Sequence, residues 1–174
     1  MKTLIVYGTQ VEWTRKIAEI IADTLKERYN HKVILSDSGI SGDIEDRIHD
    51  FDLVIAGHSI KTGFRKKGIK RFLKKYRFSI LNLAIFVATK ALPETSMQGK
   101  LSKQEAIDKA INKYIEPLKN RFQLNTISDI TFGVPFEKDP GTTFSDLNEE
   151  DIRNWATDLH ERLVSKNLLL NKAL

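Results

Sequence analysis

Cysteine is absent from the sequence, and this excludes several kinds of chemistry together. Without a thiol among the 174 residues there is no disulfide, no thiolate nucleophile and no zinc or iron–sulfur centre held by cysteine. The chain also has neither a Gly-x-Ser-x-Gly elbow nor a nucleotide-binding phosphate loop. The four histidines lack the spacing of a metal site; they are His31, His49, His58 and His160. Any redox chemistry therefore needs a bound cofactor.

Long apolar runs are absent too. No stretch approaches the roughly 18–20 residues that cross a bilayer, so we expect no membrane span, while attachment to a membrane surface stays open. The N-terminus enters a strand pattern at Thr3–Tyr7 without the regions of a signal peptide, which predicts a cytoplasmic protein. The composition, 41% hydrophobic and 29% charged, is that of an ordinary globular protein, and it predicts one domain over residues 1–174.

Acidic residues are missing from the whole stretch between Leu53 and Pro93, although the net charge of the chain is only +5. The basic residues of this stretch are Lys61, Arg65, Lys66, Lys67, Lys70, Arg71, Lys74, Lys75, Arg77 and Lys90. Two interpretations stay open. Most charge runs are solvated helix faces, whereas a positive rim would attract an anionic ligand, a nucleic acid or a lipid surface.

Short apolar segments alternate with helical periods along the chain. The five predicted strands are Thr3–Tyr7, Val33–Leu35, Leu53–Ala56, Leu83–Val87 and Ile127–Phe132. Strands that alternate with helices favour a parallel sheet, and continuously apolar strands indicate that both faces of the sheet are buried. The sequence therefore predicts a doubly wound α/β sandwich.

The helices carry recognisable start and stop signals. Thr14 is a plausible N-cap of the first helix, and Ser102 with Glu105 forms the pattern of a capping box. Pro117 should kink or end the helix that follows Ser102, and Asn148 should begin the last helix. Two further segments are expected to be a basic helix and a weaker helix or turn: Lys67–Tyr76 and Ile44–His49.

The loop after the first strand, Gly8 to Thr14, leads directly into the first helix. Backbone N–H groups at a helix N-terminus are unpaired and lie at the positive end of the helix dipole, which suits a phosphate. Thr9 and Thr14 can add hydroxyl donors. The alternative is an ordinary strand-to-helix turn in which Thr14 is simply the cap, and the loop alone leaves both open.

Three features together resemble the flavodoxin superfamily: this loop, the segment Ile55–Gly63 and the order of five strand–helix units. More narrowly, the first five residues, Thr9, Thr14-Arg15 and Ser59–Gly63 resemble the menaquinone-dependent protoporphyrinogen dehydrogenase branch. The resemblance implies a flavodoxin-like five-stranded parallel sheet of order 2-1-3-4-5, with helices on both faces, and FMN as cofactor. In such sheets the ligand lies at the carboxyl ends of the first and third strands.

The resemblance also implies which residues would bind FMN. The phosphate would be held by Thr9, Gln10, Val11, Glu12, Trp13 and Thr14. The ring would be bordered by Ser59, Ile60, Lys61, Thr62, Gly63, Phe64, Thr89, Lys90 and Ala91. Positive charge from the two lysines near the flavin would favour its anionic reduced form.

Some residues at this site allow two interpretations. Glu12 stands where family loops usually carry a small residue; its carboxylate would repel a phosphate unless it points to solvent. Trp13 either shields the flavin or packs against the sheet. Gly57 and Gly63 bracket a segment that can pass close to a planar ring, on which Phe64 or His58 would stack. For His58 the favoured alternative is a hydrogen-bonded polar residue at a strand end.

Two functions follow. The first is an FMN-dependent oxidoreductase or electron carrier, whose partner is a redox protein or a small acceptor of the quinone or porphyrinogen type. The second is a flavin-free module of the same fold that uses the basic Lys61–Arg77 face for an anionic partner. Aromatic residues near this face have helix-core spacing, which argues against sequence-specific nucleic-acid binding. The long loop Val134–Leu147 is a candidate substrate cover.

Overall fold

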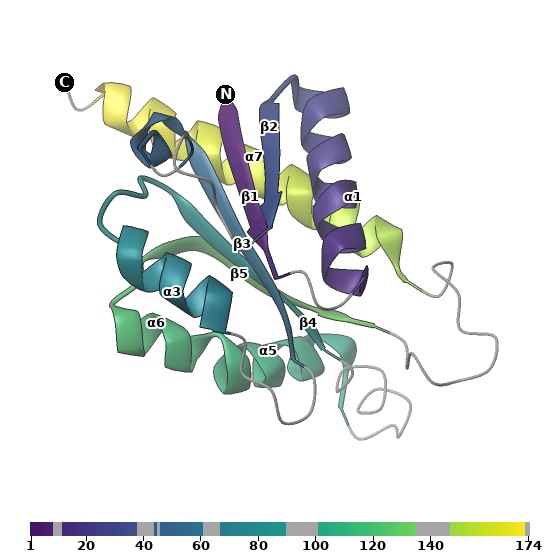
Figure 1. The fold of residues 1–174 in the computed structure, drawn as a ribbon. Helices are drawn as coiled ribbons and strands as arrows, with labels where there is room; N and C mark the ends of the chain where they lie inside the picture. The colour runs from purple at the N-terminus through teal and green to yellow at the C-terminus, as the bar shows by residue number, and fades with distance from the viewer. Residues whose placement is uncertain are drawn as a thin grey trace.

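The computed structural model describes residues 1–8, 12–37, 44, 46–60, 67–89, 101–134 and 147–172, with the side chains of 67 and 170–172 excepted. Figure 1 shows strands and helices alternating along the chain. The elements in chain order are β1 (Lys2–Tyr7), α1 (Glu12–Tyr29), β2 (Lys32–Asp37), the 3-10 turn η1 (Ile48–Asp50), β3 (Leu53–Ile60), α3 (Lys67–Tyr76), β4 (Leu83–Thr89), α5 (Lys103–Tyr114), α6 (Glu116–Phe122), β5 (Thr126–Gly133) and α7 (Glu149–Lys172).

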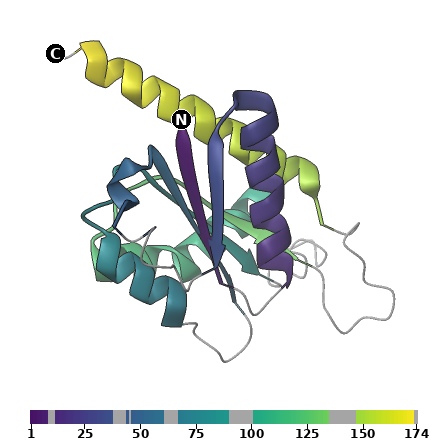
Figure 2. The same cartoon turned by 45° about the horizontal axis from the view of Figure 1, so that its top comes forward.

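The strands form one five-stranded sheet of order β2-β1-β3-β4-β5, and all four pairings are parallel. Figure 2 shows β1 lying inside the sheet. This confirms the predicted fold class and the predicted order 2-1-3-4-5. The ends of the chain's first strand are therefore flanked by β2 and β3, which fixes where the loop after β1 emerges.

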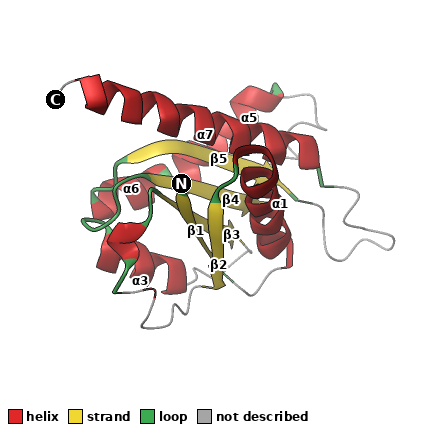
Figure 3. Cartoon of the chain, turned by 90° about the horizontal axis from the view of Figure 1, so that it is seen from above, coloured by secondary structure: helices red, strands yellow, loops and turns green. Residues whose placement is uncertain are grey.

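Alternate residues of each central strand enter two separate cores. Leu4 and Val6 of β1 belong to the core that contains α3, whereas Ile5 belongs to the core that contains α1 and α7. Seen from above, the sheet lies between α1 and α7 on one side and α3 and α6 on the other (Figure 3). Burial on both faces explains why the strands are continuously apolar.

Most of the predicted helix signals are confirmed. Ser102 caps α5 in a capping box with Glu105. The helix after it is interrupted before Pro117, which lies in the first turn of a separate helix, α6. Asn148 accepts a hydrogen bond from the backbone N–H of Asp151 at the start of α7. In the expected segment 44–49, residue 44 is helical, residues 46 and 47 form a turn, and the last two residues belong to the turn η1 (Ile48–Asp50).

The prediction that Thr14 caps the first helix is wrong. Helix α1 begins at Glu12, so Thr14 is the third helical residue. Its side chain is completely buried. An N-cap has non-helical backbone and stands before the first turn, a position that Thr14 does not occupy.

Gly57 of β3 lies beneath the ring of Phe86 in the neighbouring strand β4, its register partner. A Cβ atom at Gly57 would meet ring atoms of Phe86 at 2.0, 2.2 and 2.8 Å. Phe86 is fully buried and its ring packs edge-on against Trp155 of α7. The glycine therefore makes room for a core aromatic ring of the protein itself, and the expectation that the Gly57–Gly63 segment passes close to a planar ligand stays a prediction.

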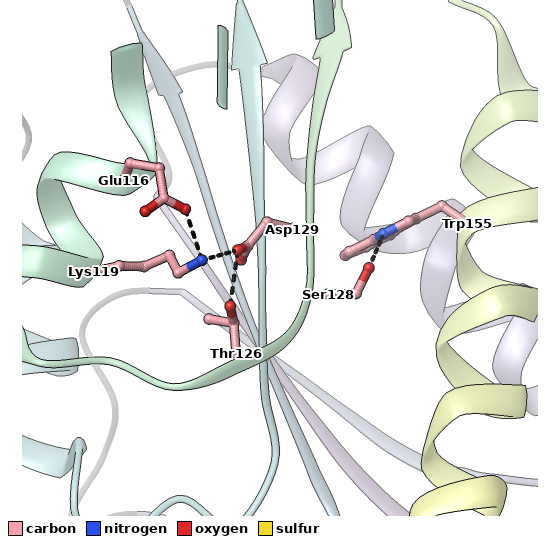
Figure 4. A network of polar contacts seen from close by, with 6 residues as sticks. All are labelled: Glu116, Lys119, Thr126, Ser128, Asp129 and Trp155. Carbon is pink, nitrogen blue, oxygen red and sulfur yellow. Dashed lines mark hydrogen bonds and ion pairs between the residues drawn. The ribbon is translucent and has the colours of Figure 1, made fainter. Parts of the chain in front are cut away.

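A polar network joins α6 to β5 (Figure 4). The Nζ of Lys119 donates to Glu116 at 2.7 Å and to Asp129 at 2.8 Å, and the Thr126 hydroxyl donates to the same Asp129 oxygen at 2.8 Å. Burial acts to lower the pKa of Lys119, but its two carboxylate partners outweigh burial and raise this pKa. The network fixes the turn between α6 and the edge strand.

Two histidines far apart in sequence meet beside the start of β2. The Nδ1 of His31 hydrogen-bonds the hydroxyl of Thr3 at 2.8 Å, and its Nε2 hydrogen-bonds Nδ1 of His160 in α7 at 3.0 Å. The ring of His160 also stacks on Tyr29, with centroids 4.0 Å apart. Burial, followed by the neighbouring His160, lowers the pKa of His31 to about 4. Neutral His31 therefore ties α7 to β1 and β2.

Among the described residues, no helix combines the length and the apolar character needed to cross a bilayer.

Adding a methyl group at Gly57 should displace the Phe86 ring from a filled core. We expect Gly57→Ala to lower the free energy of unfolding by about 2–4 kcal/mol, since overpacking and ring displacement act together. Chemical denaturation measures this. A smaller side chain at position 86 makes room for the added methyl group. The double variant Gly57→Ala/Phe86→Leu should therefore lose less stability than the sum of the losses of the two single variants. Strict additivity of the two substitutions would contradict the assigned contact.

Acid should weaken the fold through His31. The unfolded chain has a histidine pKa of about 6.5, so as the pH falls it binds a proton before the folded state, where the pKa is about 4. The stability contributed by neutral His31 is complete above pH 6.5 and lost as the pH falls toward 4. Between pH 7 and pH 5 we expect a loss of about 2 kcal/mol in urea denaturation. His31→Gln should abolish this component, whereas the exposed control His49→Gln should retain it.

Candidate functional site

The carboxyl ends of three adjacent strands form one edge of the sheet. Gly8 follows β1, and its backbone N–H donates to the carbonyl of Gly57 in β3 at 3.0 Å. On the other side of β3, Ile60 is the register partner of Thr89, the last residue of β4. The predicted site residues on β3, on β4 and at the start of α1 therefore belong to the same edge.

Thr14 carries a buried polar atom without a partner. The residue is 0% exposed. Its hydroxyl oxygen makes no hydrogen bond within the described part of the chain. A buried hydroxyl left unsatisfied costs about 1–3 kcal/mol. Because Thr14 lies in the first turn of α1, this hydroxyl and the unpaired N–H groups of the helix start are close in the chain and can act on one anion.

The two residues before Thr14 differ from each other in burial. Glu12 is exposed, so its carboxylate has access to solvent and need not face an anion at the helix start. Trp13 is only 5% exposed and belongs to the core between α1, α7 and the sheet. The structure thus supports the solvent-facing alternative for Glu12 and the packing alternative for Trp13.

Ser59 and Thr89, at the ends of β3 and β4, are buried with exposures of 5% and 2%. Ile60 is partly buried and packs against the core on the α3 side. His58, which also lies within β3, has its Nδ1 at 3.5 Å from the carbonyl of Ser59. It is a polar residue of the strand, as the sequence favoured.

Several predicted site residues lie outside the described part of the structure. These are Thr9, Gln10, Val11, Lys61, Thr62, Gly63, Phe64, Lys90 and Ala91. Most of the candidate cover loop, residues 135–146, lies outside it as well. Their contribution to the site stays a prediction.

The residues present at this edge fit a phosphate-bearing ligand. Helix α1 supplies the positive end of its dipole, and Thr14 supplies a hydroxyl that lacks a described partner. Of the two buried hydroxyl residues at the neighbouring strand ends, Ser59 pairs with Ala88 and lies on the α1 face of the sheet, whereas Thr89 pairs with Ile60 on the α3 face. Hydroxyl groups and backbone N–H groups bind an anion by donating hydrogen bonds and do not need a charged side chain.

The sequence did not predict a cavity of about 740 Å³ beside the edge strand β5. It lies between α5 and α7, and its lining includes Ile107, Phe132, Asp151 and Trp155. No motif marks these residues, because they come from three separate elements. The cavity lies next to β5, whereas the predicted site belongs to β1, β3 and β4.

The basic helix α3 does not place all of its charges at the predicted site. It follows β3, so its N-terminal end adjoins the carboxyl edge of the sheet, and its last turn, with Lys74 and Lys75, lies at the opposite end (Figure 1). The C-terminal part of the Lys61–Arg77 segment therefore lies away from the candidate cofactor site, and its role as a face for an anionic partner stays a prediction.

Comparison with known proteins identifies the fold. No family model matches the chain, and no curated protein matches it. Among solved structures, a flavodoxin from Streptococcus pneumoniae is 14% identical with a TM-score of 0.57, over 95% of this chain and 99% of that one. A WrbA-like flavodoxin from Agrobacterium tumefaciens is 16% identical with a TM-score of 0.58, over 94% and 98%.

A short-chain flavodoxin associated with a bacterial microcompartment is similar to the same degree, with 14% identity and a TM-score of 0.58 over 95% of this chain and 98% of that one. At such identities the likeness concerns the fold. The chain has the flavodoxin-like fold over nearly its whole length.

The unsatisfied hydroxyl of Thr14 can be tested without any ligand. In the ligand-free protein, Thr14→Val removes a buried hydroxyl that has no described partner, so stability should be unchanged or rise by up to about 1–2 kcal/mol. Thr24 is the matched control, since it is equally buried in α1 but donates to the carbonyl of Ile20 at 2.7 Å. Thr24→Val should cost about 1 kcal/mol. Equal losses for both variants in urea denaturation would contradict the assignment.

Proposed function

We propose that the protein binds FMN at the carboxyl edge of the sheet and serves as a redox protein. The observation that carries the proposal is the buried hydroxyl of Thr14 at the start of α1, for which the described part of the chain provides no hydrogen-bond partner. Burying such a group lowers stability, and binding a phosphate there would offset that cost. A phosphate at a helix N-terminus also gains from the helix dipole.

The fold supports the same proposal. The chain is similar to solved flavodoxins over nearly its whole length. In doubly wound sheets ligands bind outside the carboxyl ends of the strands, where the strand order reverses. In this sheet the reversal lies between β1 and β3, and the start of α1 follows β1 directly. The proposed phosphate site therefore coincides with the place where the topology opens a crevice.

Glu12 does not oppose this proposal. It is exposed, and the groups offered to the phosphate are the backbone N–H groups of the loop and first turn together with hydroxyls. The residues proposed to hold the phosphate are Thr9, Gln10, Val11, Glu12 through its backbone, Trp13 through its backbone, and Thr14. The loops that begin after Ile60 and Thr89 would border the ring.

Bound FMN would supply reversible electron transfer. The chain itself would hold the phosphate, orient the ring at the edge of the sheet and limit the access of water. For the electron partner we propose a redox protein or a small molecule of the quinone or porphyrinogen type. This finer assignment depends on the resemblance in the Ser59–Gly63 stretch.

Titration of the ligand-free protein with FMN, followed by flavin fluorescence, tests the proposal. We expect saturable quenching in the wild type. Thr14→Val should weaken binding by about ten- to a hundredfold, because a hydroxyl that donates to a charged phosphate is lost. Disrupting Thr9 and Thr14 together should weaken binding further.

Thr24→Val is the control for this titration. It alters a buried threonine of the same helix whose hydroxyl donates to the carbonyl of Ile20. It should leave the FMN affinity unchanged. If the wild-type protein ignores FMN at high concentration, the proposal is wrong. Equal affinity of the wild type and Thr14→Val would show that this hydroxyl does not face the phosphate.

A further inference from the structure

A basic pocket lies at the end of the sheet opposite to the candidate cofactor site. It has a volume of about 320 Å³ and lies between the C-terminal ends of α3 and α6, where Lys74, Arg77 and Arg121 line it. In the described part of the chain no carboxylate pairs with these three cations, and Glu116 and Asp129 are both engaged by Lys119.

The C-terminus of a helix attracts cations, and this accounts for a single basic residue at such an end. Three cations around one pocket repel each other, however, and an anionic group between them would relieve that repulsion. The pocket is therefore complementary in charge to an anion such as a phosphate.

The turn after α3 carries exposed apolar side chains beside this pocket. Phe78 is 79% exposed and Leu81 is 66% exposed. The guanidinium of Arg77 lies over the Phe78 ring, 4.3 Å from its centroid, and also donates to the carbonyl of Lys74. The turn thus combines a fixed cation with an apolar surface, the pairing found where proteins meet the interface of a bilayer.

A second apolar segment approaches the same turn. The Nζ of Lys166 in α7 donates to the side chain of Asn82 at 2.7 Å, directly after Leu81. Two and three residues after Lys166 in α7, Leu168 and Leu169 are 56% and 70% exposed. Apolar side chains from two distant parts of the sequence therefore lie at the same end of the molecule, with a lysine between them.

We propose that this end of the protein docks on an anionic membrane surface. The docking surface consists of Lys74, Arg77, Phe78, Leu81, Arg121, Lys166, Leu168 and Leu169. The cations would bind lipid phosphates, and the aromatic and leucine side chains would enter the boundary between headgroups and acyl chains.

The chemistry favours a membrane over the other anionic partners. Proteins that bind single-stranded nucleic acid stack successive bases on several aromatic side chains, but the docking surface has one aromatic residue, Phe78, and leucines do not stack. A stable protein complex needs a large complementary surface, whereas peripheral membrane binding needs few apolar side chains and several cations.

Docking through this surface also determines which way the candidate cofactor site faces. The docking surface lies at the amino ends of the strands, and the Thr14 site lies at their carboxyl ends. A protein docked in this way would present the candidate cofactor site to the aqueous phase. The inference does not depend on FMN binding, because the two surfaces share no residue.

Sedimentation of the full-length protein with vesicles tests the docking surface. We expect binding to vesicles that contain phosphatidylglycerol, loss of binding in high salt, and no binding to pure phosphatidylcholine. Phe78→Ser/Leu81→Ser and Arg77→Gln/Arg121→Gln should each lower the partition coefficient by about tenfold or more. All four residues are at or near the surface, so circular dichroism should confirm unchanged folding.

Two control variants match these changes elsewhere on the surface. Arg15→Gln/Lys16→Gln removes the same charge from the start of α1, and Ile34→Ser removes an apolar side chain, 43% exposed, from the edge strand β2. Both should bind vesicles like the wild type. Equal losses in the controls and in the docking-surface variants would mean that net charge or general hydrophobicity governs binding, and would overturn the proposal.

A site-specific probe separates docking at this surface from docking elsewhere. Phe78→Trp adds a tryptophan at the exposed turn, and the two native tryptophans, Trp13 and Trp155, are buried. Its emission should shift to the blue and be quenched by lipids that carry a quencher on the acyl chain. Sedimentation without this shift, or no binding to anionic vesicles at all, would overturn the proposal.

Discussion

The close contact between β3 and β4 constrains the rest of this structure. Gly57 leaves space for the Phe86 ring, and that ring then packs against Trp155 of α7. Because both faces of the central strands are buried, a shift of one residue in register would send every side chain into the wrong core. The register of these strands therefore fixes the carboxyl edge of the sheet, where Ile60 and Thr89 end side by side.

Stability and function make different demands at the start of α1. Helix α1 buries in its first turn the hydroxyl of Thr14, which has no partner in the described part of the chain. Ten residues along the same helix, Thr24 satisfies its hydroxyl on the carbonyl of Ile20. The two threonines differ because Thr24 has the helical carbonyl of Ile20 four residues before it, whereas the residue four positions before Thr14 precedes the helix. Under the proposed function, a bound phosphate would satisfy the Thr14 hydroxyl.

The two ends of the sheet differ in chemistry because the helices run antiparallel to the strands. The carboxyl edge offers hydroxyls and a helix N-terminus, which bind an anion without side-chain charge. The amino end collects the last turns of α3 and α6, and with them Lys74, Arg77 and Arg121. The acid-free segment between Leu53 and Pro93 thereby contributes residues to both ends of the sheet, Ser59 and Ile60 to one and Lys74 and Arg77 to the other.

The sequence by itself determined the strands, the parallel sheet and most helix starts, because apolar periodicity and capping residues act locally. The strand order 2-1-3-4-5 followed from the resemblance to the flavodoxin superfamily. The sequence also pointed to the loop before Thr14. Only the tertiary structure decided that this hydroxyl is buried without a described partner, that Gly57 accommodates Phe86, and that His31 meets His160 across 129 residues. Such contacts depend on strand register and on the docking of α7, which brings together residues that no local pattern relates.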